Sequence, residues 1–505
     1  MNKIIEALEN EINSEIAYGE NGMPALATSS NANLDYYSAL GGLRGRDDEA
    51  LRLFNAAYLE DKTLALANLF NTRDPRSGMG ERSVANVILK NLMFADKKVF
   101  LSILPLIPHF GRWKDIFEIC SYSIILKDVE LAIANLIVDC LNSKDNALLA
   151  KYIPLKPKSA SVQGVMSVVR KKMKLSPKNF RKLIVSIRTD VVEVKMSSKK
   201  FDEIEFGKVP SMAMMRYKTS FYKRDGLRFA EYIENVKSGV DKINSATLTP
   251  EDVVNDAYRF FDNKSTSDAS NRIAIDAQWL ALKNHFGETP SNLNIIPVID
   301  VSGSMIQAGV MGAAVGLGIY LSERNNGYLR NYACSFSTRP RIFKISGGDI
   351  CSKVKSVCNS SNVGYGTNFK ETIVKLANFI VDNDIPEEQE PKVILFLSDM
   401  NFDESTQRSE ELRGAGKYQL SKKATEIVKE VYGDLALNPP KVVFWNLDFN
   451  GTYAAGSTSD GFAMVGGKSA SQIRGVLSGI DNFTPYNIMI ENLSKYIPVA
   501  MMAVK

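Results

Sequence analysis

Residues 295–305 read IIPVIDVSGSM, and this stretch decides the fold of the C-terminal half. Its first five residues are apolar and are typical of a buried strand. Asp300, Ser302 and Ser304 follow at alternate positions, so one carboxylate and two hydroxyls can face the same small cation. Mg²⁺ takes oxygen ligands in a near-octahedral shell and keeps several waters. The stretch therefore predicts a site for Mg²⁺, or for another divalent cation such as Mn²⁺, with no catalytic base in it.

Two later segments supply further oxygen ligands. Residues 364–368 read GYGTN and place Thr367 in a glycine-rich loop before a predicted helix. Residues 392–399 read KVILFLSD and form a second apolar strand that ends at Asp399. Ligands in open α/β sheets gather at the carboxyl ends of the strands. We therefore expect Thr367 and Asp399 to meet the first three side chains there.

The segments DVSGS, GYGTN and FLSDM resemble the metal-ion-dependent adhesion site of von Willebrand factor A domains. The resemblance implies that Ser302, Ser304 and Thr367 ligate the metal directly, and that Asp300 and Asp399 act largely through water. It also implies a Rossmann-like domain over residues 289–505. A D-x-S-x-S string alone is a weak signal, because a metal-free turn at the end of a strand has the same pattern.

Strands and helices alternate after a turn-rich join at residues 285–290, which indicates a doubly wound α/β domain. Residues 401–416 and 451–462 are polar or small and are expected to form loops. The predicted strands are 294–300, 328–336, 340–345, 391–399 and 440–448. The predicted helices are 305–324, 368–383, 415–432, 469–478 and 485–496.

The N-terminal part, residues 1–288, has helical spacing of apolar residues almost throughout from about Asp47. Prolines mark breaks or first turns between the segments. Successive helices with short joins favour a stacked, HEAT-like α-helical repeat, either open or closed into a ring. No internal repeat is clean enough to assign a period. The expected fold is therefore multidomain, an α-helical repeat followed by an α/β domain.

Composition narrows the class of protein. The 505 residues include 45% hydrophobic and 24% charged residues, as in ordinary globular proteins. The start of the chain carries glutamates where a signal peptide needs an apolar run, and no stretch approaches the length of a membrane span. We expect a cytoplasmic protein with no membrane contact. The five cysteines include no C-x-x-C pair, and the chain has only two histidines. These residues offer few ligands for structural zinc and few side chains for histidine-dependent catalysis, so we expect no enzyme.

Positive charge is concentrated in one window. The whole chain has a net charge of +5, but residues 151–230 hold 20 Lys and Arg against 6 Asp and Glu. That window nets +14, and the remainder of the chain nets −9. Such asymmetry suggests a polyanionic partner, most often nucleic acid.

Residues 178–188 can form a helix that packs one face on the protein and presents its positive charge to a partner. At 100° per residue, one side of a helix holds Phe180, Leu183, Ile184 and Ile187. The opposite side holds Lys178, Arg181, Lys182 and Arg188. A solvated basic face is the alternative, and the concentration of charge around this helix argues against it. The predicted nucleic-acid contacts are Arg170, Lys171, Lys172, Lys174, Lys178, Arg181, Lys182 and Arg188.

The N-terminal part resembles the TROVE module of the Ro RNA-binding autoantigen, which is a helical ring also followed by a von Willebrand A domain. Residues 25–31, 39–44 and 72–82 carry the resemblance, the last reading TRDPRSGMGER. The chain is also similar to an uncharacterised family of plant, phage and large-virus proteins with this architecture, through residues 110–115 and 191–196. Arg73, Arg76 and Arg82 in the motif TRDPRSGMGER either line phosphates or pin a turn through Asp74 and Glu81, and the structural role is favoured.

Three functions remain open. The resemblance favours a non-catalytic protein that binds small structured RNA. The second hypothesis is a protein-interaction scaffold in which the metal grips an acidic side chain of a partner, without nucleic acid. The third, a metal-dependent hydrolase, is weaker because a hydroxyl-rich ligand set holds a carboxylate better than it activates water.

Overall fold

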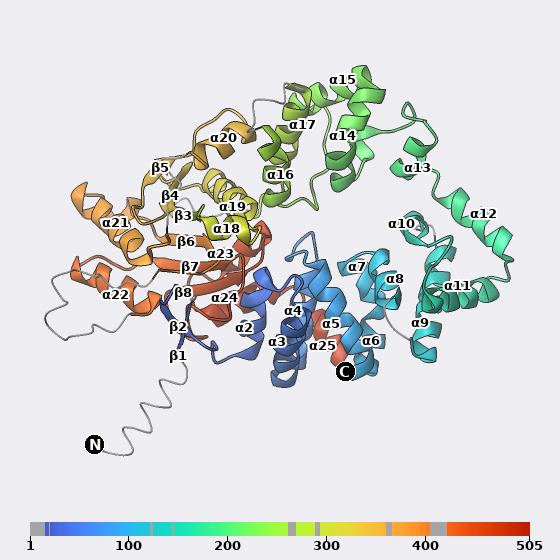
Figure 1. Cartoon of the computed structure of the whole chain (residues 1–505), viewed down its shortest axis with the longest axis horizontal. Coiled ribbons are helices and arrows are strands. Elements are labelled where there is room, and N and C mark those ends of the chain that lie inside the picture. Colours follow the sequence, from blue (N-terminus) through green and yellow to red (C-terminus); the bar gives the residue numbers. More distant parts are fainter. Residues whose placement is uncertain are drawn as a thin grey trace, which may run out of the picture. The chain divides into compact units, whose positions relative to one another are not determined.

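The computed structural model describes residues 16–19, 21–121, 125–143, 146–260, 269–287, 293–359, 366–403 and 422–505. Its N-terminal part is largely helical, and its C-terminal part contains a mixed sheet with helices (Figure 1). This confirms the coarse prediction of a multidomain chain in which helices precede an α/β domain. Among the helices that the structure describes, none combines the length and the apolar composition that a membrane span requires.

The C-terminal sheet has six strands in the order β5-β4-β3-β6-β7-β8. All neighbouring pairs are parallel except β4 and β5, which pair antiparallel at one edge. Both central strands are buried at every position, as expected for a parallel sheet covered on both faces. The strands are β3 (Ile295–Asp300), β4 (Tyr332–Phe336), β5 (Ile342–Lys344), β6 (Val393–Ser398), β7 (Lys441–Asn446) and β8 (Phe462–Gly466).

The order of the strands reverses between β3 and β6, which is a topological switch point of the sheet. After β3 the chain moves to β4 and β5 on one side, and it then returns to β6 on the other side. Such a reversal leaves the carboxyl ends of the two central strands open to ligands. Ile299 lies opposite Leu397 in the ladder, so Asp300 and Ser398 leave adjacent strands side by side.

Most of the sheet helices lie within a few residues of their predicted positions, but the predicted helix 305–324 is divided into Gly303–Gln307 and Met311–Arg324, and the helix Ile350–Val357 was not predicted. The helix expected at 415–432 is described from Ala424, and residues 404–421 lie outside the described residues. The expected loop 451–462 ends at β8, a strand that the sequence did not indicate because it is short and glycine-flanked. The helices are α18 (Gly303–Gln307), α19 (Met311–Arg324), α20 (Ile350–Val357), α21 (Phe369–Asp382), α22 (Ala424–Asp434), α23 (Ile473–Ser478) and α24 (Pro485–Leu493).

The chain forms two compact units, and they do not divide at the expected residue 288. The α/β unit comprises Met1–Asn68, Leu248–Asp268 and Leu282–Lys495, and the helical unit comprises Leu69–Thr247, Ala269–Ala281 and Tyr496–Lys505. Besides the sheet and its helices, the α/β unit holds β1 (Ile16–Tyr18), β2 (Pro24–Leu26), α2 (Ala32–Ala39), α3 (Asp47–Glu60) and α16 (Pro250–Ala257).

The helical unit consists of helices joined by short connections, without a strand among its described residues. Helix α4 (Lys62–Arg73) leads into it from the α/β unit. Its other helices are α5 (Arg82–Ala95), α6 (Lys97–Ile103), α7 (Ile107–Phe110), α8 (Trp113–Ser121), α9 (Lys127–Asn142), α10 (Ala147–Tyr152), α11 (Ala160–Lys172), α12 (Pro177–Ile187), α13 (Val192–Ser197), α14 (Ser211–Arg224), α15 (Gly226–Lys237), α17 (Ala269–Leu280) and α25 (Ile497–Val504).

Specific contacts explain why N-terminal residues belong to the α/β unit. A Cβ added to Gly42 would collide with the backbone nitrogen of Phe449, so only glycine allows this approach. The buried Tyr37 hydroxyl donates to Gln472 Oε1 at 3.1 Å and accepts from Asn492 Nδ2 at 2.9 Å. These contacts join residues more than 400 positions apart.

Candidate functional site

The first three predicted metal ligands lie together after β3. Asp300 is the last residue of the strand and is fully buried. Ser302 is the N-cap residue of α18, and its backbone N–H donates to Asp300 Oδ1 at 2.9 Å. The hydroxyl oxygens of Ser302 and Ser304 are 3.0 Å apart. The turn from strand to helix therefore gathers one carboxylate and two hydroxyls.

The end of β6 adds the second carboxylate through a serine that the sequence analysis did not single out. The Ser398 hydroxyl donates to Asp300 Oδ2 at 2.7 Å and lies 3.3 Å from Asp399 Oδ1. The signal was present in the motif FLSDM, since Ser398 directly precedes Asp399 and the parallel register sets it beside Asp300. Ser398 thus joins the two carboxylates.

Thr367 reaches the same edge from the loop before α21. Its hydroxyl donates to the Asn401 carbonyl at 2.5 Å, and the Asn401 N–H donates to Asp399 Oδ1 at 3.1 Å. Asp403 Oδ2 accepts from the Thr367 N–H at 2.6 Å. One chain of hydrogen bonds therefore connects all five predicted ligands, which we call the oxygen cluster. Gly364 and Tyr365 of the GYGTN motif lie outside the described residues.

Glycine is required beside Thr367. Gly366 has φ +98°, and a Cβ there would lie 2.6 Å from Asp403 Oδ2. Other residues rarely adopt this backbone conformation, and the space is taken by the carboxylate that holds the Thr367 N–H. The glycine-rich loop thus fixes the threonine by conformation and by close packing.

The electrostatics of the oxygen cluster favour a cation. The pKa of Asp300 is raised to about 6, chiefly by burial and also by the neighbouring Asp399 carboxylate, against hydrogen bonds from Ser302 and Ser398 that lower it. Burial also raises the pKa of Asp448, which follows β7, and Asp399 adds to this effect. Buried like charges repel, and a bound cation relieves that repulsion.

The chemistry of the donors fits a hard cation. Two carboxylates and three hydroxyls are all oxygen donors, the kind that Mg²⁺ and Mn²⁺ prefer. Within the part of the chain that the structure describes, no group of three or more His, Cys, Asp and Glu side chains gathers as a metal site. A metal at the oxygen cluster therefore depends on the hydroxyls for most of its protein ligands.

The eight predicted nucleic-acid contacts lie on α11, on α12 and at the ends of these helices. Arg170, Lys171 and Lys172 form the last turn of α11, and Lys174 adopts φ +54° in the turn that follows. The apolar face of α12 is buried at Phe180 and Ile184, as predicted. Lys178, Arg181 and Lys182 are exposed on α12, and Arg188 is its half-buried C-cap residue.

These eight cations have no acidic partner in the part of the chain that the structure describes. Among the described residues, their side chains make no hydrogen bond or ion pair. Other cations of the basic window differ. Arg228 binds Asp225 at 2.6 Å and lies 4.5 Å from the Phe206 ring centroid, and Lys218 is buried. The structure therefore divides the basic window into cations that stabilise the fold and cations that remain available.

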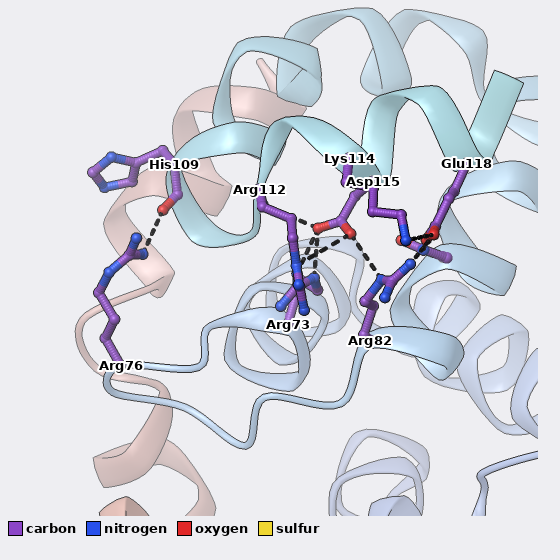
Figure 2. Close-up of polar contacts among 9 residues, drawn as sticks. Arg73, Arg76, Arg82, His109, Arg112, Lys114, Asp115 and Glu118 are labelled. Atoms are coloured by element: carbon purple, nitrogen blue, oxygen red, sulfur yellow. Dashed lines mark hydrogen bonds and ion pairs between the residues drawn. The ribbon is translucent and has the colours of Figure 1, made fainter. Parts of the chain in front are cut away.

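The arginines of the TRDPRSGMGER motif have identifiable partners (Figure 2). The buried Asp115 carboxylate accepts from Arg73 at 2.6 and 2.8 Å and from Arg82 at 3.2 Å. Arg76 donates to the His109 carbonyl at 3.2 Å. Arg73 and Arg82 are therefore structural. Their partner is Asp115 on α8, whereas Asp74 and Glu81 were the residues expected from the sequence.

Comparison with known proteins gives two matches to family models and one relative. Residues 128–289 match a domain of unknown function (DUF2828), and residues 294–490 match a domain of unknown function (DUF7788). The chain is similar to uncharacterized protein L728 of Acanthamoeba polyphaga mimivirus. The two are 24% identical over 527 residues, which cover 96% of this chain and 88% of that protein.

Proposed function

We propose that this chain is a non-catalytic, cytoplasmic RNA-binding protein that resembles Ro ribonucleoproteins. Its basic helical surface binds small structured RNA, and its C-terminal part is a von Willebrand factor A-like domain that binds a divalent cation. The observation that carries the RNA part is the set of eight cations on and directly after α11 and α12, none of which pairs with a described residue. A cation without an acidic partner releases the counterions of a phosphate when RNA binds. A cation that is already held in an ion pair does so less, because its charge is already neutralised.

The oxygen cluster supports the metal part. Ser302, Ser304 and Thr367 would hold Mg²⁺ or Mn²⁺ directly, with Asp300 and Asp399 acting through water. When bound, the cation offers a coordination position to an anionic oxygen from outside the chain. The protein's own contribution is positional, since Ser398 and Asn401 hydrogen-bond the carboxylates in place before any ion arrives.

A second function is favoured by the small number of carboxylates in the oxygen cluster. Two carboxylates balance a divalent charge only when both are ionised, and burial opposes ionisation of Asp300. An ion held there attracts an additional carboxylate. The alternative is therefore a metal-dependent protein-interaction scaffold, whose partner supplies an Asp or Glu and in which no nucleic acid takes part.

The test of RNA binding is a salt titration of affinity for small structured RNA. We expect the Kd of the full chain to rise steeply with salt, because several phosphate contacts are made. Changing Lys178, Arg181 and Lys182 together to Glu should weaken binding at least about tenfold and flatten the salt dependence.

The control carries the same change in net charge elsewhere. Lys127→Glu, Lys237→Glu and Lys370→Glu alter three exposed lysines on α9, α15 and α21. If this control weakens binding as much as the triple change on α12, the basic helices are not the binding surface. If RNA binding is absent and an acidic protein partner binds only with Mg²⁺, the scaffold is the better account.

A further inference from the structure

The helical unit contains a groove that the sequence did not indicate. It lies among the segment that joins α10 to α11, the C-terminal half of α11, and α12, and its volume is about 680 Å³. Pockets of about 300–1,000 Å³ typically hold small ligands or short segments of a polymer. The groove is therefore large enough for about one or two nucleotides.

The floor of this groove is apolar and includes the aromatic ring of Phe180. Pro154, Leu155 and Met166 contribute to it from one side, and Val185 contributes from α12. Val185 is 45% exposed in spite of its apolar side chain. An exposed apolar strip inside a groove costs free energy unless a ligand covers it.

The rim of the groove is cationic. Lys156, Arg170, Lys178, Arg181 and Lys182 line it, and no Asp or Glu is among the described residues that do. Four of these cations belong to the predicted set, and Lys156 is additional. None of the five side chains makes a hydrogen bond or ion pair with a described residue. The groove thus combines an apolar floor with five uncompensated positive charges.

We infer that this groove binds an unpaired, single-stranded segment of RNA, with bases against the floor and phosphates along the rim. The inference rests on the proposed RNA-binding function and names the part of the RNA that the site takes. A duplex presents phosphates and sugars on a convex surface and does not reach an apolar floor. Unpaired nucleotides expose base faces, which pack on apolar side chains and on guanidinium planes.

The surroundings of the groove favour a polyphosphate over an acidic peptide. Lys171 and Lys172 at the end of α11, and Lys174 in the turn that follows, are not among the lining residues and have no partner among the described side chains. A nucleic-acid chain that leaves the groove continues onto this cationic surface. A peptide short enough to fill the groove gains nothing from these three lysines.

Matched variants separate the groove from the general basic surface. Arg181→Glu with Lys182→Glu changes two exposed cations that line the groove. Lys171→Glu with Lys172→Glu makes the same change in charge at two exposed cations that do not. Val185→Ser removes apolar floor without changing charge. Fluorescence anisotropy of the full chain measures affinity for a short oligouridine and for a blunt-ended RNA duplex.

We expect the lining pair to weaken oligouridine binding about tenfold more than the control pair, and both pairs to weaken duplex binding equally. Val185→Ser should weaken only oligouridine binding, about threefold. If the two pairs weaken oligouridine binding equally, the groove is not the binding site, and RNA binding by the basic surface still stands. Displacement of the oligouridine by a glutamate-rich apolar peptide at lower concentration would also overturn the groove as the site for RNA. If the unmodified chain binds neither RNA, the proposed function itself fails.

Discussion

Asp300 is the side chain on which the chemistry of the oxygen cluster depends most. It is buried at the end of β3, accepts two hydrogen bonds, and has a second carboxylate nearby. Burial disfavours the ionised form, and the hydrogen bonds recover only part of that cost. Without a cation, the folded chain therefore holds a proton on this carboxyl at a higher pH than the unfolded chain does.

This difference predicts how stability depends on pH. Because the pKa of Asp300 rises from 3.8 to about 6 on folding, its contribution to the free energy of unfolding falls as pH increases through this range. The loss is about 3 kcal/mol, since each pKa unit corresponds to about 1.4 kcal/mol. Without divalent cations, Asp300→Asn should therefore gain stability relative to the unmodified chain between pH 4 and pH 7. Urea denaturation at several pH values measures this, and parallel pH profiles of the two chains would contradict it.

At the scale of the element, α8 is anchored by a buried ion pair. Asp115 is fully buried on this helix and binds Arg73, whose side chain is 5% exposed, and Arg82 (Figure 2). Burial lowers the pKa of Arg73, and the Asp115 carboxylate opposes this effect. Removal of one partner from a buried pair leaves an uncompensated charge, which costs more than the pair itself contributes.

Asp115→Asn should therefore destabilise the helical unit by about 3–5 kcal/mol. Asp128→Asn is the matched control on α9, because Asp128 forms an exposed pair with Lys97 at 2.6 Å. It should leave the denaturation midpoint unchanged. If Asp115→Asn lowers the free energy of unfolding by less than about 1 kcal/mol, as the loss of an exposed pair does, the arginines find other partners and the prediction is contradicted.

The elements differed in how well the sequence predicted them. Strands β3 and β6 are long apolar runs, and the residues that end them were correctly expected at one edge of the sheet. Strand β8 was missed, because five residues between glycines carry too little pattern. Ser398 and Asp115 were also missed as partners, since both make contacts with residues distant in sequence. Local periodicity identifies an element, but it does not identify what packs against that element.

At the scale of the molecule, the α/β unit includes residues from the N-terminal part of the chain. The helical pattern of residues 32–60 gave no sign that these helices pack with the sheet, because apolar spacing is the same whichever core it faces. The one local signal was Gly41-Gly42, where side chains are excluded by the backbone at the end of β7. The expected boundary at residue 288 followed the change in secondary structure and not the packing.

Gly42→Ala tests this assignment. The added methyl group has no room beside Phe449, so we expect the α/β unit to lose about 1–3 kcal/mol of stability. Gly433→Ala on α22 is the control, because a Cβ there meets open space. Hydrogen exchange resolves the two units. Destabilisation confined to the helical unit, or no effect of Gly42→Ala, would contradict the assignment of residues 16–68.

The most direct test of the central claim is calorimetric titration of Mn²⁺ or Mg²⁺ into the metal-free full chain. The account predicts a single saturable site that Asp300→Ala abolishes while the sheet stays folded. Ser322→Ala, a buried change on α19 outside the oxygen cluster, should leave the site unaltered. Absence of saturable binding to the unmodified chain, or equal affinity of the Asp300→Ala variant, would contradict the claim that these five oxygen-bearing side chains form a metal site.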